Sequence, residues 1–399
     1  MTTPNMEAET AQAEIPGKVA KALGAQLVNG ALAAEILPVY VSFQRRLPRT
    51  VISNLSPHAA RESTERVRSS LQVAGVDYPR TRVIVNLGPT PAPVRSGPLL
   101  DLPMALAVWA ADCEGLATAA GTVGRRTVFV GELSLSGEVR APSRGLVAIA
   151  EACLREDYAL ACSRDAIPMV AHLDGLRVYP LLTLMDAMQV WIGARHPVTM
   201  HEEVLPTSAT DPAWGRVRQN WIGVEPLIEQ ALRALAEDRP ILVAGSRACS
   251  FAKLVGLAGP PPKDDAAVRR VQSAAGLSVV GGRPFSVVGG RPFRAPHHTV
   301  TLGAMVGDLS HPGELSLASG GTLLVDDARE WPLATLRGVI GAWISGVVSG
   351  TKGNRPALFD LIFTVEPGQL ASMFSRLQGY LGEFEGPRPR EIEVIVLPD

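Results

Sequence analysis

The sequence predicts an α/β protein of two domains, and three observations lead to this fold class. The chain has 399 residues, of which 46% are hydrophobic and 19% charged, so it holds enough apolar material for more than one packed core. Short apolar runs alternate with stretches of helical periodicity along most of its length. A polar stretch with three prolines, residues 196–215, interrupts the alternation and is typical of a linker.

The first predicted domain covers residues 18–195 and follows a polar, acidic tail at 1–17. Strands are expected at Pro38–Phe43, Arg82–Leu87 and Thr127–Leu133, and helices at Pro57–Val73, Leu100–Ala111, Leu146–Arg155 and Leu181–Ile192. Pro57 suits a first helical turn, and Ser56 before it suits an N-cap. Residues 131–139 are expected to form a hairpin in which Ser134 and Ser136 are strand hydroxyls rather than nucleophiles.

The second predicted domain covers residues 216–399 and alternates helices with buried strands. Helices are expected at Pro226–Ala236, Ser250–Leu257 and Pro332–Ile344, and strands at Pro240–Ala244, Thr322–Asp326, Leu358–Val365 and Ile392–Leu397. This order predicts a parallel sheet with helices on both faces. The octapeptide SVVGGRPF occurs twice in tandem, at 278–285 and 286–293, and its Gly-Gly and Arg-Pro pairs predict a hairpin or loop in each copy.

Composition excludes several classes of protein. No apolar run reaches the roughly 20 residues that a membrane helix needs, and the N-terminus lacks the basic start and apolar stretch of a secretory signal. The cysteines are neither closely paired nor spaced as zinc ligands; they are Cys113, Cys153, Cys162 and Cys249. We therefore expect a cytoplasmic protein with no membrane partner. The net charge of −1 gives no bulk attraction to nucleic acid, although local basic patches can act alone.

The strand–turn–helix at 240–257 is where a phosphate-binding loop would lie. Such a loop needs glycines for close backbone approach, a lysine for the phosphates and a hydroxyl for magnesium. The candidates for cofactor binding here are Gly245, Ser246, Arg247 and Ser250.

The residues that follow depart from this pattern. Phe251 stands at the lysine position and Ala252 at the hydroxyl position. Lys253 comes two residues later, about 200° around a helix, and is expected to point away from the phosphates. A plain strand–turn–helix is therefore favoured over an intact nucleotide loop, whose backbone donors are the part retained.

An acidic pair follows the second buried strand of this domain. Asp326 and Asp327 come directly after Leu-Leu-Val, which is how a P-loop ATPase holds magnesium and polarises water. Asp326 is the candidate magnesium ligand.

Two histidines and several arginines lie near the tandem octapeptide. His297 and His298 are adjacent, and on an extended strand their rings would point to opposite faces, so a shared metal ion is disfavoured. The arginines Arg283, Arg291 and Arg294 are interleaved with phenylalanines. They form either a nucleic-acid contact with stacked bases or a solvated hairpin, and the two interpretations are equally favoured.

These motifs resemble magnesium-chelatase-like AAA+ proteins of the ComM (YifB) type. The resemblance covers about residues 22–399 and is most specific at Arg291–Gly307 and Pro312–Asp327. Four earlier segments look like the family's N-terminal domain, which is similar in fold to the Lon protease domain: Glu65–Leu71, Val83–Leu87, Asp101–Leu106 and Val130–Glu138. The resemblance implies a Lon-protease-like domain followed by a truncated P-loop (AAA+) core without the C-terminal lid.

The family's known properties give roles to individual residues. The resemblance implies an AAA+ ring that binds ATP and Mg²⁺, with Asp326 and Asp327 as the Walker B acids. Glu366 matches the sensor asparagine, because Thr-Val-Glu-Pro at 364–367 stands where the family has A-M-N-P. Arg390 matches the arginine finger. The protease serine position falls near Leu99 and the lysine position near Val147, so peptidase activity is not expected.

Three functions remain open at this point. The favoured one is a degenerate ATPase that acts as a scaffold or regulator in DNA recombination or natural transformation. Its partners would be copies of itself or an active AAA+ subunit, which Arg390 would serve in trans. The second is an active branch-migration motor on DNA in which Arg247 replaces the lysine, because ComM-type members are linked to DNA branch migration. The third is a decayed gene product.

Overall fold

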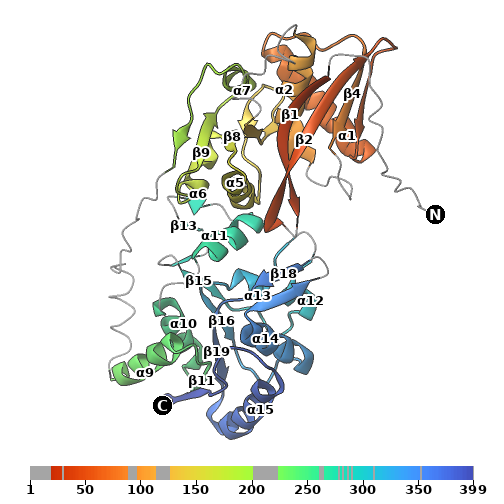
Figure 1. The fold of residues 1–399 in the computed structure, drawn as a ribbon. Helices are drawn as coiled ribbons and strands as arrows, with labels where there is room; N and C mark the ends of the chain where they lie inside the picture. The colour runs from red at the N-terminus through yellow and green to blue at the C-terminus, as the bar shows by residue number, and fades with distance from the viewer. Residues whose placement is uncertain are drawn as a thin grey trace, which may run out of the picture. The chain divides into compact units, whose positions relative to one another are not determined.

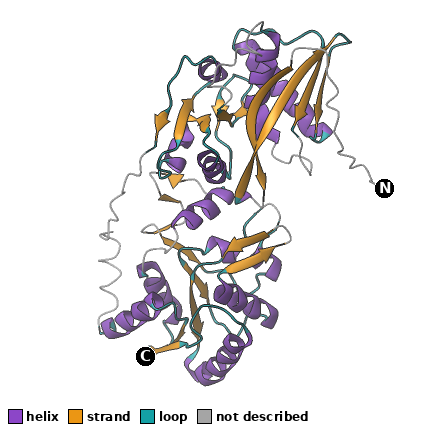
Figure 2. Cartoon of the chain, in the orientation of Figure 1, coloured by secondary structure: helices purple, strands orange, loops and turns teal. Residues whose placement is uncertain are grey.

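The computed structural model describes residues 19–28, 31–88, 97–113, 126–200, 223–259, 265–276, 279–280, 283–284, 287–288, 291–308, 311–350 and 353–398 (Figures 1 and 2). The predicted tail at 1–17 and most of the predicted linker at 196–215 lie outside these ranges. The chain divides into two compact units. One comprises Met1–Gly24, Leu37–Val139 and Leu181–His196, and the other comprises Ala25–Ile36, Arg140–Pro180 and Pro197–Asp399. The domain boundaries given by the sequence remain a prediction.

A mixed eight-stranded sheet is formed before residue 200, in the order β10-β9-β8-β5-β1-β2-β4-β3. Its strands are β1 (Val19–Val28), β2 (Ala33–Gln44), β3 (Arg49–Ser53), β4 (Arg82–Leu87), β5 (Thr127–Phe129), β8 (Ala159–Ser163), β9 (Arg177–Leu181) and β10 (Val198–Thr199). Strand β2 pairs antiparallel with β4, and β3 pairs parallel with β4. The strand expected at 127–133 is divided, because β5 ends at Phe129 and a separate hairpin follows.

The helices of this region agree closely with the sequence pattern. They are α1 (Pro57–Val73), α2 (Asp101–Asp112), α5 (Leu146–Arg155), α6 (Ile167–Val170) and α7 (Leu184–Trp191). Ser56 caps α1, since its hydroxyl accepts a hydrogen bond from the Ala59 amide at 3.3 Å. The expected hairpin is present as β6 (Glu132–Leu133) and β7 (Val139–Arg140). Ser134 and Ser136 lie in the turn between these strands, so the expectation that they are strand hydroxyls was wrong. The Ser134 hydroxyl accepts the Glu138 amide at 3.0 Å and lies 2.8 Å from the Ser136 hydroxyl, which is a turn-forming role.

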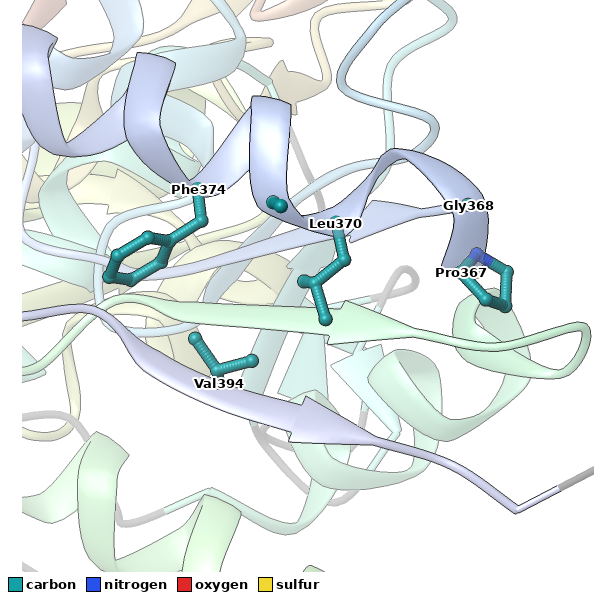
Figure 3. A pocket seen from close by; sticks show the side chains of 6 residues that line it. Pro367, Gly368, Leu370, Phe374 and Val394 are labelled. Atoms are coloured by element: carbon teal, nitrogen blue, oxygen red, sulfur yellow. The ribbon is translucent and has the colours of Figure 1, made fainter.

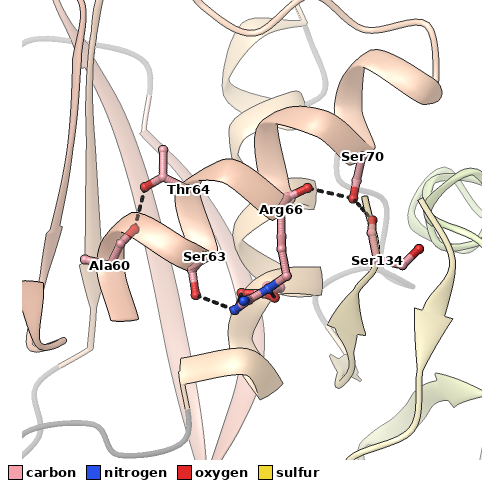
Figure 4. Close-up of polar contacts among 7 residues, drawn as sticks. Ala60, Ser63, Thr64, Arg66, Ser70 and Ser134 are labelled. Atoms are coloured by element: carbon pink, nitrogen blue, oxygen red, sulfur yellow. Dashed lines mark hydrogen bonds and ion pairs between the residues drawn. The ribbon is translucent and has the colours of Figure 1, made fainter. Parts of the chain in front are cut away.

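An ion pair with a buried carboxylate joins α1 to α2. The Arg66 Nε donates to the Asp101 carboxylate at 2.6 Å. The same guanidinium donates to the Ser63 hydroxyl at 3.2 Å (Figure 4). Asp101 is fully buried, whereas Arg66 keeps part of its side chain in solvent. Burial therefore raises the pKa of Asp101 to about 6, although hydrogen bonds from Arg66 act in the opposite direction.

A six-stranded sheet forms the core after residue 223, in the order β14-β15-β16-β19-β11-β20. The strands are β11 (Ile241–Ala244), β14 (Val287–Val288), β15 (Arg291–Arg294), β16 (Thr322–Val325), β19 (Asp360–Val365) and β20 (Glu393–Val396). All neighbouring pairs from β15 to β20 are parallel. The parallel sheet predicted from the alternation of strands and helices is confirmed.

Helices cover both faces of this sheet, as Figure 1 shows for α10 and α14. Alternate strand residues enter two apolar clusters, because successive side chains of a strand point to opposite faces. Leu323, Val325 and Phe363 pack with the α14 and α15 side, and Leu324 and Ile362 pack with the α9 and α10 side. The helices are α9 (Glu225–Ala236), α10 (Ala248–Ala258), α11 (Asp265–Ala274), α12 (Leu302–Val306), α13 (Glu314–Leu317), α14 (Leu333–Ser345) and α15 (Leu370–Glu383).

Each copy of the tandem octapeptide forms a short hairpin, as predicted. Strand β12 (Val279–Val280) pairs antiparallel with β13 (Arg283–Pro284), and β14 pairs with β15 in the same register. A further hairpin consists of β17 (Val347–Gly350) and β18 (Gly353–Pro356). Within the described ranges, no helix has the length and hydropathy needed to cross a bilayer.

The buried Asp101 makes stability depend on pH in a direction that can be measured. Its folded pKa of about 6 lies above the ordinary 3.8, so the folded state binds the proton more tightly, and lowering the pH through this window stabilises the fold. Between pH 7 and pH 4.5, the free energy of unfolding of the natural chain should rise by about 2 kcal/mol relative to Asp101→Asn. Urea unfolding of both proteins at the two pH values checks this. A constant difference between them would show that burial does not control this carboxyl.

Candidate functional site

The carboxyl edge of the parallel sheet brings together some of the residues that the sequence singles out. Ala244 pairs with Val365, and Val325 pairs with Phe363, so β11, β16 and β19 end at the same edge. The loop after Ala244, the acids after Val325 and Glu366 after Val365 therefore leave the sheet together. This is the edge at which open α/β sheets bind ligands.

The loop between β11 and α10 is short and tightly packed. Gly245 has φ +145°, and a Cβ at this position would lie 2.9 Å from Leu397 Cβ, so the position requires glycine. Helix α10 begins at Ala248, whose amide donates to the Gly245 carbonyl at 3.1 Å. The sequence predicted a start at Ser250, two residues later. Ser246, Arg247 and Ser250 are exposed.

Phe251 lies on the face of α10 that packs against the sheet. Phe251 and Ala252 are both fully buried in the apolar cluster between α10 and the sheet. The side chain at the lysine position therefore faces the strands and not the loop. Charge at this position would have to be placed inside an apolar layer, which is strongly unfavourable.

Lys253 is exposed on α10, and the expectation that it points away from the phosphates stays a prediction. Residues four apart share a helix face, so Lys253 lies on the same face of α10 as Cys249. Burial raises the pKa of the Cys249 thiol, Asp326 raises it further, and Lys253 lowers it.

Asp326 and Asp327 form a turn that is held by β19. The Thr364 hydroxyl donates to Asp326 Oδ1 at 2.6 Å and accepts the Asp327 amide at 2.8 Å. Asp326 is exposed, and Asp327 has φ +41°, a left-handed conformation that costs free energy for residues other than glycine. Sequence reasoning missed Thr364, because only the pairing of β16 with β19 places it beside the acids.

Glu366 and Arg390 are exposed at two different segments. Glu366 directly precedes the 3₁₀ turn Pro367–Gln369. The Arg390 carbonyl accepts Gln378 Nε2 at 2.9 Å, which fixes the main chain before β20. Nearby, Arg388 lies 5.0 Å from the Trp343 ring centre and donates to the Phe359 carbonyl at 2.6 Å. Burial lowers the pKa of Arg388.

The histidine pair differs from the prediction. The rings of His297 and His298 have centres 4.0 Å apart, because the chain forms a turn here and not an extended strand. Among the described residues, no group of three or more His, Cys, Asp or Glu side chains is arranged to hold a metal ion. Arg294 forms a bidentate pair with Glu314 at 2.6 Å. The side chains of Arg283 and Arg291 lie outside the part of the chain that the structure describes.

A shallow apolar pocket of 470 Å³ lies beside Glu366, between the start of α15 and β20 (Figure 3). Its lining residues are Pro367, Gly368, Leu370, Ala371, Phe374 and Val394. None of these side chains carries charge.

The edge does not match the way in which the family holds ATP and Mg²⁺. The side chain at the lysine position is buried and apolar, and no hydroxyl follows it. One oxygen of Asp326, the candidate magnesium ligand, already accepts the Thr364 hydroxyl. Arg247 and Lys253 are the cationic side chains of this loop and helix, and neither occupies the lysine position.

Comparison with known proteins gives two family matches and several relatives. Residues 39–162 match subunit ChlI of Mg-chelatase, and residues 250–373 match magnesium chelatase, subunit ChlI. The chain is 27% identical over 394 residues to competence protein ComM of Haemophilus influenzae, covering 92% of this chain and 74% of that protein. It is 28% identical over 350 residues to the uncharacterized protein YifB of Escherichia coli, covering 83% of this chain and 65% of that protein.

Restoring the lysine at position 251 should not restore a phosphate site. Phe251→Lys places a cation in the apolar layer and should lower the free energy of unfolding by more than about 3 kcal/mol. The matched control Phe251→Leu keeps the position apolar and should lower it by about 1.5 kcal/mol or less. Urea unfolding measures both. Equal stability of the two variants would show that position 251 can turn out to solvent.

The left-handed Asp327 makes a second stability prediction. Asp327→Gly relieves the backbone strain but raises the conformational entropy of the unfolded chain. These effects oppose each other, so the free energy of unfolding should stay within about 1 kcal/mol of the natural value. Asp327→Val keeps the strain and adds branching at Cβ, and should lower that value by about 1–3 kcal/mol. Thermal and urea unfolding separate the two. The prediction fails if valine is tolerated as well as glycine.

Proposed function

Because the chain belongs to the ComM/YifB-type magnesium-chelatase-like family, we propose that it is a ComM-like AAA+ protein with a degenerate ATPase core. In this proposal it binds nucleotide weakly, turns over little or no ATP, and works as a scaffold or regulator in DNA recombination or natural transformation. The name of one relative, competence protein, supports the biological setting.

The burial of Phe251 is the observation that carries the proposal. A phosphate-loop lysine and the adjacent hydroxyl each make charge-assisted contacts of roughly 1.5–3 kcal/mol. Losing both weakens binding by about two to four orders of magnitude, at roughly 1.4 kcal/mol for each decade. Phosphoryl transfer also depends on positive charge fixed beside the phosphates, so turnover should decline further than binding.

The exposed Arg390 supports a role in an assembly. Arg390 is exposed just before β20 and matches the family's arginine finger. In the proposal, it serves the nucleotide of a neighbouring subunit, either another copy or an active AAA+ partner. The arginines near the tandem octapeptide remain candidates for a DNA contact, although Arg294 is engaged by Glu314.

The exposure of Arg247 favours one alternative. Arg247 lies directly before α10, so its guanidinium could bind phosphate in place of the lysine, and the protein would then be a working motor on DNA. Tight magnesium-dependent binding that is lost in Arg247→Ala would favour this alternative.

Calorimetric titration with ATP and Mg²⁺, together with a hydrolysis assay and sedimentation of the full chain, tests the proposal. The expected result is a dissociation constant in the millimolar range or weaker, no steady turnover, and a stable oligomer or a specific partner. Arg247→Ala and Asp326→Ala should leave these values unchanged. ATP turnover that is abolished by Asp326→Ala would refute the degenerate core, and an unstable protein without a partner would favour a decayed gene product.

A further inference from the structure

Thr364 contacts three consecutive residues of the turn after β16. Its hydroxyl donates to Asp326 Oδ1 at 2.6 Å and accepts the Asp327 amide at 2.8 Å, and its carbonyl accepts the Ala328 amide at 2.9 Å. Thr364 is 3% exposed, so little water competes for these bonds. The buried hydroxyl of Thr364 thus bonds one oxygen of the Asp326 carboxylate and the amide of Asp327, which both follow the neighbouring strand β16.

A contact from Trp331 also holds this turn. The Trp331 indole donates to the Asp326 carbonyl at 3.0 Å, and Trp331 is almost fully buried. The hydroxyl of Thr364 has one proton, which goes to Asp326, so its oxygen is free to accept the Asp327 amide. A hydrogen bond to an ionised carboxylate is stronger than one between neutral groups. Together these contacts offset the strain of the left-handed Asp327.

We propose that Thr364 is a positioning residue that holds Asp326 and its turn in one conformation without a metal ion or nucleotide. The proposal rests on the proposed function in one respect, namely that Asp326 is not a working magnesium ligand. An alanine at position 364 could supply only the carbonyl contact to the Ala328 amide. The hydroxyl of this chain adds an acceptor for the Asp327 amide and a donor for the Asp326 carboxylate.

The consequence is an edge of the sheet that is ordered before any ligand arrives. A metal ion at Asp326 would meet a carboxylate whose Oδ1 already accepts the Thr364 hydroxyl. Ligand binding would therefore add little further order to residues 326–328.

Amide hydrogen exchange of the Asp327 amide in the full-length protein tests the proposal. Thr364→Val keeps the shape and removes the hydroxyl, and should speed exchange by roughly 10–100-fold. The conservative control Thr364→Ser keeps the hydroxyl and should exchange within about threefold of the natural protein. Adding Mg²⁺ and ATP to the natural protein should leave exchange unchanged.

Asp326→Ala tests the same bond from the acceptor side and serves if the valine variant does not fold. The hydroxyl then loses the group that orients it, so exchange of the unaltered Asp327 amide should rise. Equal exchange in the natural protein, the valine variant and the serine variant would overturn the proposal. So would strong protection that appears only with Mg²⁺ and ATP. ATP turnover would refute the proposed function instead, and it would leave the exchange result standing.

Discussion

The packing of α10 against the parallel sheet is the constraint on which the candidate site depends. Phe251 and Ala252 fill the apolar layer between this helix and the strands, so the helix must start at Ala248 and the loop before it is limited to three residues. Gly245 makes this tight connection possible because no Cβ fits against Leu397. Arg247 and Lys253 flank position 251 in the sequence, and neither occupies it.

Much of the fold follows from local sequence pattern. Helices α1 and α5 begin and end where the periodicity places them, because α5 has a continuous apolar stripe, and α1 has a proline and a capping serine at its start. Two missed elements have residues that weaken their local signal, although Met373, Leu377 and Leu381 recur at helical spacing in α15. Helix α15 contains Gly379 and Gly382, which lower helix propensity, and β1 is rich in alanine, which is uncommon in strands. Tertiary packing decides both.

The sequence pattern predicts only those site residues that directly follow a strand. The sequence places Asp326 and Asp327 after a buried strand, the resemblance singles out Glu366, and the register of the sheet brings their strand ends together. Thr364 could not be found in this way, because its contacts depend on which strands are neighbours.

Hydrogen bonding and exposure to water lower the cost of gathering acids at this edge. Asp326, Asp327 and Glu366 bring three carboxylates to the strand ends. The Thr364 hydroxyl bonds one oxygen of Asp326, and the Asp327 amide is satisfied by the same hydroxyl. Asp326 and Glu366 are exposed, so water screens their charges. An acidic strand end of this kind has the sequence pattern of a metal site, while the carboxylate of Asp326 takes part in holding the turn.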